Sequence, residues 1–150
     1  MKPMIAIALL VMCASCAVST EEVERREQRE AEIGEIISLS ATDADGNPSL
    51  KRCLRDEEYR SFRALDGRHL LFKGNQGRLW INTLKSHCPD LRLDDVLYVR
   101  VASRRRMCEL DTLWFWHRKT WHSPGMTCAL GEFRPVSEEQ VAEIRAVLRR

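Results

Sequence analysis

Between residues 59 and 133 the chain alternates apolar and polar positions in short runs that turn-forming residues separate. Side chains of a β-strand point alternately to its two faces, so a period of two predicts strands. Asp66-Gly67 and the glycines at 74 and 77 predict tight hairpin turns between the first three strands. The predicted strands cover 59–65, 68–73, 78–84 and 96–102, a fifth and longest one lies within 107–121, and a short sixth covers 128–133.

The fifth predicted strand carries three of the chain's four tryptophans. In its second half both faces are apolar, which leaves two interpretations. Either the rest of the domain covers this end of the strand on both sides, or the end is an exposed aromatic patch that contacts a partner or a membrane interface. The side chains of that contact surface would be Trp114, Phe115, Trp116 and Trp121.

Two helices flank the predicted strands. At the C-terminal end, Ser137 and Gln140 form a capping-box pattern, and Val141, Ile144 and Leu148 make an apolar stripe at helical spacing. Residues 20–37 are dominated by Glu and Arg, and apolar positions are sparse until Ile33. This segment predicts a solvated helical spacer of which only the end can dock.

Composition limits the function classes. The chain has 150 residues, 44% hydrophobic and 31% charged, with a formal net charge of +2. These values are typical of one globular domain with accessory segments, and the near-neutral charge argues against nucleic acid as a partner. Along the chain, the segments described above and the export signal described below divide it into three parts. They are a signal peptide (1–16), a charged helical spacer and linker (17–50) and a β domain with a C-terminal helix (51–150).

The N-terminus has the anatomy of an export signal. Lys2 precedes the apolar run 4–12, which is much shorter than the roughly 20 residues that a spanning helix needs. Ser15 and Cys16 resemble the end of a bacterial lipoprotein signal, in which the cysteine is lipidated, although Cys13 departs from that motif. The alternative is simple cleavage after Ala17, giving a soluble periplasmic or secreted protein. Because Ala17, the residue directly after Cys16, is not acidic, the lipoprotein interpretation favours the outer membrane, facing the periplasm.

Four cysteines lie in the predicted domain, and export would favour their oxidation. If the five strands form a consecutive antiparallel meander, Cys53 and Cys108 lie at one end of the sheet and Cys88 and Cys128 at the other. The predicted disulfides are Cys53–Cys108 and Cys88–Cys128. A nested pairing, Cys53–Cys128 with Cys88–Cys108, is the alternative.

Several short motifs occur in a familiar order: His69 to Phe72, Asn82-Thr83-Leu84, Cys88-Pro89-Asp90-Leu91, Cys108-Glu109-Leu110-Asp111, and the run from Cys128 to Ser137. Together they resemble a domain-of-unknown-function family of small exported proteins, often lipoproteins, of Gram-negative bacteria. The resemblance covers roughly residues 51–137. It implies export and a four-cysteine frame, and it implies no catalytic residue.

The fold that we expect is mainly β (α+β): a small antiparallel sheet of five or six strands, a meander or barrel-like, with disulfides, a C-terminal helix and an N-terminal helical spacer. The sequence favours a non-enzymatic interaction or structural module of the cell envelope, without a cofactor. The alternative is a periplasmic hydrolase or metal-binding enzyme that uses His117 and His122 with His87 as a third ligand.

Overall fold

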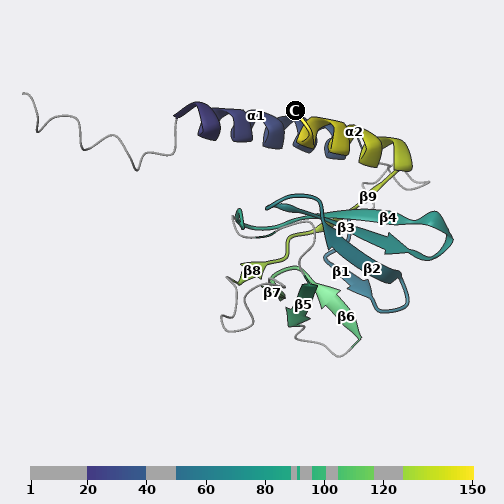
Figure 1. Ribbon diagram of the computed structural model, residues 1–150. Helices are drawn as coiled ribbons and strands as arrows, with labels where there is room; N and C mark the ends of the chain where they lie inside the picture. Colours follow the sequence, from purple (N-terminus) through teal and green to yellow (C-terminus); the bar gives the residue numbers. More distant parts are fainter. Residues whose placement is uncertain (1–19, 40–49, 89–90, 92–95, 101–104, 117–126) are drawn as a thin grey trace, which may run out of the picture.

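The computed structural model describes residues 20–39, 50–88, 91, 96–100, 105–116 and 127–150, and of residues 96–100, 115 and 116 it describes the backbone. Two helices and a series of short strands make up these residues (Figure 1). The helices are α1 (Thr20–Ser38) and α2 (Glu138–Leu148). The strands are β1 (Cys53–Arg55), β2 (Tyr59–Ala64), β3 (His69–Gly74), β4 (Leu79–Thr83), β5 (Val96–Arg100), β6 (Arg106–Cys108), β7 (Thr112–Trp116), β8 (Cys128–Ala129) and β9 (Phe133–Val136).

A four-stranded antiparallel sheet in the order β2-β3-β4-β9 forms the centre of the molecule. The predicted hairpins join β2 to β3 and β3 to β4, and a short 3₁₀ turn at Asn75–Gly77 lies in the second connection. Strand β9 closes the sheet beside β4, with Pro135 opposite Trp80. Proline has no backbone N–H to donate, so its presence suits an edge strand.

The strands β3 and β4 are buried on both faces over most of their length, which explains their nearly continuous apolar runs. Phe72 and Trp80 point to one face and belong to a core cluster with Leu113 and Leu130. The intervening residues of the same strands point to the other face and pack against the helices: Leu71, Leu79 and Ile81.

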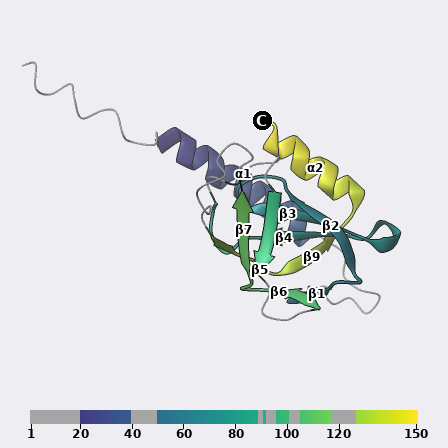
Figure 2. The same cartoon turned by 60° about the horizontal axis from the view of Figure 1, so that its bottom comes forward.

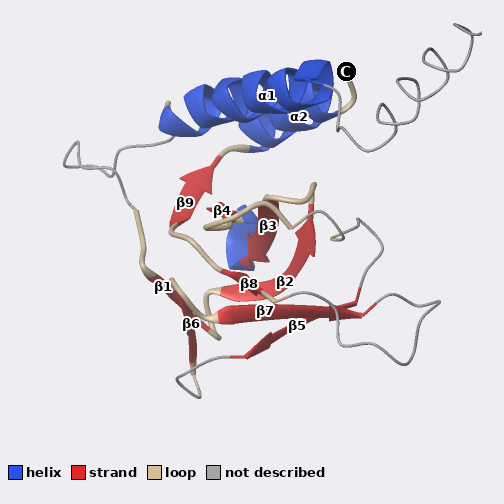
Figure 3. Cartoon of the chain, turned by 90° about the vertical axis from the view of Figure 1, so that its left-hand side faces the viewer, coloured by secondary structure: helices blue, strands red, loops and turns tan. Residues whose placement is uncertain are grey.

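The two helices lie side by side over one face of the sheet (Figures 1 and 3). Ile33 and Ile37 of α1 share a core cluster with Val141 and Ile144 of α2. Ser137 accepts a hydrogen bond from the N–H of Gln140, and the Gln140 side chain accepts one from the N–H of Ser137, so the predicted capping box is present. Among the described residues, neither helix combines the length and the apolar character that crossing a bilayer requires.

Two small antiparallel sheets cover the other face. One consists of β1 and β6, and the other has the order β5-β7-β8; Figure 2 shows β5 and β7 side by side. The apolar cluster between these sheets and the central sheet includes Leu54 of β1, Met107 of β6 and Leu113 of β7. The molecule therefore has three layers: helices, a central sheet and two small sheets.

The expected fold class is confirmed: a mainly β domain with antiparallel sheets and a helix at each end of the described chain. The assumed strand order is wrong beyond β4, because β4 pairs with β9 and β5 belongs to a separate sheet. The predicted short strand over 128–133 is two strands, β8 and β9, in different sheets.

The prediction of one long strand within 107–121 is also wrong. A turn at Glu109 and Leu110 divides it into β6, which pairs with β1, and β7, which pairs with β5 and β8. Leu110 adopts a left-handed conformation, with φ of 71°, and its N–H donates to the carbonyl oxygen of Leu130 at 2.9 Å. The carboxylate of Asp111 accepts the N–H of Cys108 at 2.7 Å, which closes the turn.

Candidate functional site

The structure brings together the cysteines of both predicted pairs. Cys53 and Cys108 lie opposite each other in the register of β1 and β6, with Cα atoms 4.0 Å apart. Cys88 and Cys128 have Cα atoms 6.4 Å apart and belong to the core between the central sheet and the small sheets. The first pair ties two adjacent strands, and the second ties the segment after β4 to β8.

The proposed aromatic contact surface lies only partly within the described residues. Trp114 lies in β7 opposite Tyr98 and is half-buried. Phe115 and Trp116 continue β7 opposite Leu97 and Val96. Trp121 lies outside the described residues, so this surface stays a prediction.

Of the remaining predicted residues, Cys16, His117 and His122 lie outside the described part of the chain. His87 is described and half-buried. In the part of the chain that the structure describes, no three His, Cys, Asp or Glu side chains are grouped so that they could hold a metal ion. Because two of its three histidines lie outside the described residues, the three-histidine metal site stays a prediction.

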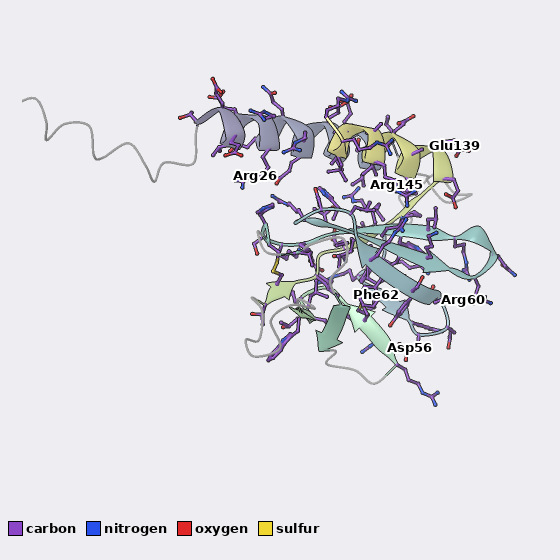
Figure 4. The ribbon with its side chains drawn as sticks, viewed as in Figure 1. Arg26, Asp56, Arg60, Phe62, Glu139 and Arg145 are labelled. Atoms are coloured by element: carbon purple, nitrogen blue, oxygen red, sulfur yellow. A yellow bond between two sulfur atoms is a disulfide. The ribbon has the colours of Figure 1, made fainter. Side chains whose placement is uncertain are left out.

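His87 lines a cavity of about 150 Å³ between α1 and the turn that joins β2 to β3, which we call the α1 cavity. Its walls come from four parts of the chain that are far apart in sequence. They are Arg26, Arg29, Glu30, Ile33, Leu65, Asp66, His87 and Leu148. Figure 4 shows the Arg26 side chain on the side of α1 that faces the strands.

Asp66 organises the floor of the α1 cavity. Its Oδ1 atom accepts the backbone N–H groups of Arg68 at 2.8 Å and His69 at 2.6 Å, and it lies 3.0 Å from Nδ1 of His69. This is an Asx-type turn, in which an aspartate side chain takes the place of a backbone acceptor. Burial opposes ionisation of Asp66, but the hydrogen bonds from the His69 ring and the two N–H groups outweigh it, so the pKa of Asp66 lies below its ordinary value.

His87 reaches the α1 cavity because Gly67 leaves room for it. A Cβ atom on Gly67 would lie 2.7 Å from Cε1 of His87 and 2.7 Å from the carbonyl oxygen of Cys88. The N–H of Cys88 donates to the carbonyl oxygen of Gly67 at 2.7 Å, which holds the two segments together. Nδ1 of His87 is buried, and no described residue offers it a hydrogen-bond partner.

An ion pair connects α1 to the same turn. Nη1 of Arg68 donates to Oε2 of Glu30 at 2.6 Å, and both side chains are partly buried. The carboxylates of the α1 cavity are thus engaged by Arg68 and His69, while Arg26 and Arg29 form no ion pair with a described residue. This combination of guanidinium groups with an apolar wall can bind an anion.

The sequence did not identify this site apart from His87. Asp66-Gly67 predicts a hairpin turn, and the arginines of residues 20–37 indicate a solvated helix face. One signal was available: Arg26, Arg29, Ile33 and Ile37 follow at intervals of three and four, which places them on one face of a helix. The tertiary contact that turns this face towards the hairpin could not be read from it.

Residues of the resemblance motifs have a structural role. Asn82 is fully buried, and its side chain donates to the carbonyl oxygen of Gly131 at 2.7 Å and accepts the N–H of Gly131 at 3.0 Å. A Cβ atom at Gly131 would lie 2.0 Å from the carbonyl oxygen of Thr83, so only glycine fits there. Leu130 and Phe133 are core residues, and Ser137 caps α2.

The comparisons with known proteins agree with that resemblance in that the matching family is also one of unknown function. A family model described as a family of unknown function (DUF6491) matches residues 1–150. Searches of curated proteins and of solved structures found no match. Since the match covers the whole chain, this protein belongs to DUF6491, a family of unknown function.

Proposed function

We propose that this protein is an exported module of the cell envelope, anchored by a lipid on Cys16, that binds a partner or ligand and catalyses no reaction. The observation that carries the proposal is the pairing of the four cysteines beyond residue 50. Both pairs lie within disulfide reach, and Cys88 and Cys128 are buried in the core. Paired structural cysteines are typical of proteins folded in an oxidising compartment.

The position of α1 supports a membrane-proximal domain. The helix begins at Thr20, close behind the proposed lipidation site at Cys16, and its C-terminal half packs on the domain. A lipid on Cys16 would therefore hold the β domain near the bilayer through a short segment and a helix that is part of the fold. Ala17 carries no charge, which supports the outer membrane and a periplasmic orientation.

A macromolecular partner would contact the aromatic end of β7 and the segment that follows, through Trp114, Phe115, Trp116 and Trp121. Three tryptophans and a phenylalanine within eight residues give a large contact area at small cost in side-chain entropy. Crosslinking of envelope partners tests this surface. We expect Trp116→Ala to lose the crosslinked partner and Leu39→Ala, a change at the exposed residue that follows α1, to retain it.

Intact-mass measurement of the protein from host membranes, with and without reduction, tests the proposal. We expect a chain that starts at Cys16, carries acyl groups and gains the mass of four hydrogen atoms on reduction of two disulfides to four thiols. Cys16→Ser should release the protein from the membrane fraction, whereas Cys13→Ser should leave it there. A lipid-free chain that starts at Val18 would contradict the lipid anchor. Free thiols in the membrane-derived protein would contradict the pairing of the four cysteines.

A further inference from the structure

We infer that the α1 cavity is a binding site for a small organic acid, held as its carboxylate by Arg26, Arg29 and His87. The inference rests on the proposed function, since it names the ligand class of a binding module. It concerns a different part of the molecule from the aromatic end of β7.

The charges in the α1 cavity leave cations available for a ligand. Glu30 is engaged by Arg68 at 2.6 Å, and Asp66 by the ring of His69 at 3.0 Å and by two backbone N–H groups. Arg26 and Arg29, both half-buried, have no carboxylate of a described residue within ion-pair distance. A guanidinium that is partly withdrawn from water gains from an anionic partner, so the missing component is an anion.

His87 supplies an independent observation. Its Nδ1 atom is buried and has no hydrogen-bond partner among the described residues, and the His87 residue lines the cavity. A buried polar atom without a partner loses its hydrogen bonds to water and gains none in return, and native proteins rarely leave one in that state. In the tautomer with a proton on Nδ1, His87 would donate a hydrogen bond to a carboxylate oxygen.

The size and the apolar wall of the cavity select the kind of anion. Its volume of about 150 Å³ equals that of cavities that accommodate benzene, so a ligand of roughly six to ten non-hydrogen atoms fits. Ile33, Leu65 and Leu148 form the apolar part of the wall. An inorganic anion such as phosphate would leave that wall without a contact, whereas an organic acid places a carboxylate beside the arginines and an apolar body against these side chains.

Calorimetric titration of benzoate into the protein purified from its host envelope tests the inference, with benzamide as an uncharged probe of the same shape. We expect benzoate to bind and benzamide to bind at least tenfold more weakly. Arg26→Gln and Arg29→Gln should each raise the dissociation constant for benzoate about tenfold or more, because each removes a charge-assisted hydrogen bond. Arg25→Gln is the matched control, since Arg25 is exposed on the same helix and does not line the cavity.

A second readout separates binding in the α1 cavity from binding elsewhere. The ring ¹⁵N signals of His87 should shift on addition of benzoate, and the shift should be absent in Arg29→Gln, whose thermal unfolding should match that of the wild type. Equal binding of benzoate and benzamide, an equal loss in Arg25→Gln, or binding of phosphate in place of benzoate would overturn the inference.

Failure of this inference can be told from failure of the proposed function. Absence of benzoate binding by protein recovered from the membrane fraction would overturn the ligand class and leave the envelope location intact. Benzoate binding by protein recovered only from the cytosolic fraction would support the α1 cavity and overturn the envelope location.

Discussion

Asp66 shows how one side chain at a turn can fix both a hairpin and a cavity wall. Three donors converge on its Oδ1 atom: two backbone N–H groups and the ring of His69, whose own side chain is almost fully buried. The turn therefore depends on a charge as well as on the absence of a side chain at Gly67. That dependence makes the stability of the protein sensitive to pH at this residue.

We expect Asp66→Asn to lower the free energy of unfolding at pH 7 by about 1–3 kcal/mol, because it weakens hydrogen bonds to a charged acceptor. The pKa of Asp66 is depressed in the folded state, so the stabilisation is present above the unfolded pKa and is lost as pH falls through the folded pKa. The difference between wild type and variant should therefore shrink below about pH 4. Urea unfolding of both proteins between pH 7 and pH 3 measures it.

Asp56 provides the control for this measurement. It is an exposed aspartate in the turn between β1 and β2, and its contact is a long one of 3.4 Å from the hydroxyl of Tyr59 (Figure 4). Asp56→Asn should change stability little at any pH. A stability difference for Asp66→Asn that stays constant from pH 7 to pH 3 would contradict the role assigned to its carboxylate.

At the scale of elements, α1 has two unlike halves. Its first turns carry mostly charged side chains, while Ile33 and Ile37 are buried among residues of α2 and the central sheet. The side chain of Gln140 in α2 donates to the carbonyl oxygen of Ile36 at 2.9 Å, and Arg150 pairs with Glu32 at 3.0 Å. The C-terminal half of α1 is thus a structural part of the domain.

This division predicts unequal effects of truncating apolar side chains along α1. Ile33→Ala should lower the free energy of unfolding by about 2–4 kcal/mol, because Ile33 is fully buried and its removal leaves a cavity. Val23→Ala should change it by less than about 0.5 kcal/mol, since Val23 belongs to neither core cluster. Urea unfolding of the two variants checks this. Equal stabilities would mean that α1 is a spacer along its whole length.

Local signals predicted the elements, and long-range contacts decided what the sequence could not show. The capping box at Ser137 and the hairpin at Asp66-Gly67 each depend on residues that are close together in sequence. For this reason α2 and the β2–β3 hairpin were predictable. The turn at Leu110 was not, because leucine rarely adopts positive φ and the contact with Leu130 that holds it there comes from twenty residues further along the chain. The pairing of β4 with β9, like the α1 cavity, depends on residues that only the folded chain brings together.

At the scale of the whole molecule, the two cysteine pairs occupy unlike environments. Cys53 and Cys108 are half-buried in the two-stranded sheet of β1 and β6, whereas Cys88 and Cys128 have relative exposures of 0% and 3%. The first pair closes a loop of 55 residues and the second one of 40. In the chain-entropy account, a disulfide that closes a loop of either length stabilises the fold by about 4 kcal/mol. The two disulfides therefore differ more in their accessibility than in the stability that they contribute.

Because a reductant must reach a sulfur atom, we expect stepwise reduction of the folded protein. Cys53–Cys108 should open first under mild dithiothreitol, and Cys88–Cys128 should react only when the core between the central sheet and the small sheets opens. Brief reduction, alkylation and mass mapping measure the order. Addition of urea below the unfolding midpoint should speed reduction of the second pair more than that of the first. Simultaneous labelling of all four cysteines in native buffer would show that the core pair is no better protected than the strand pair, and would contradict the three-layer packing around Cys88.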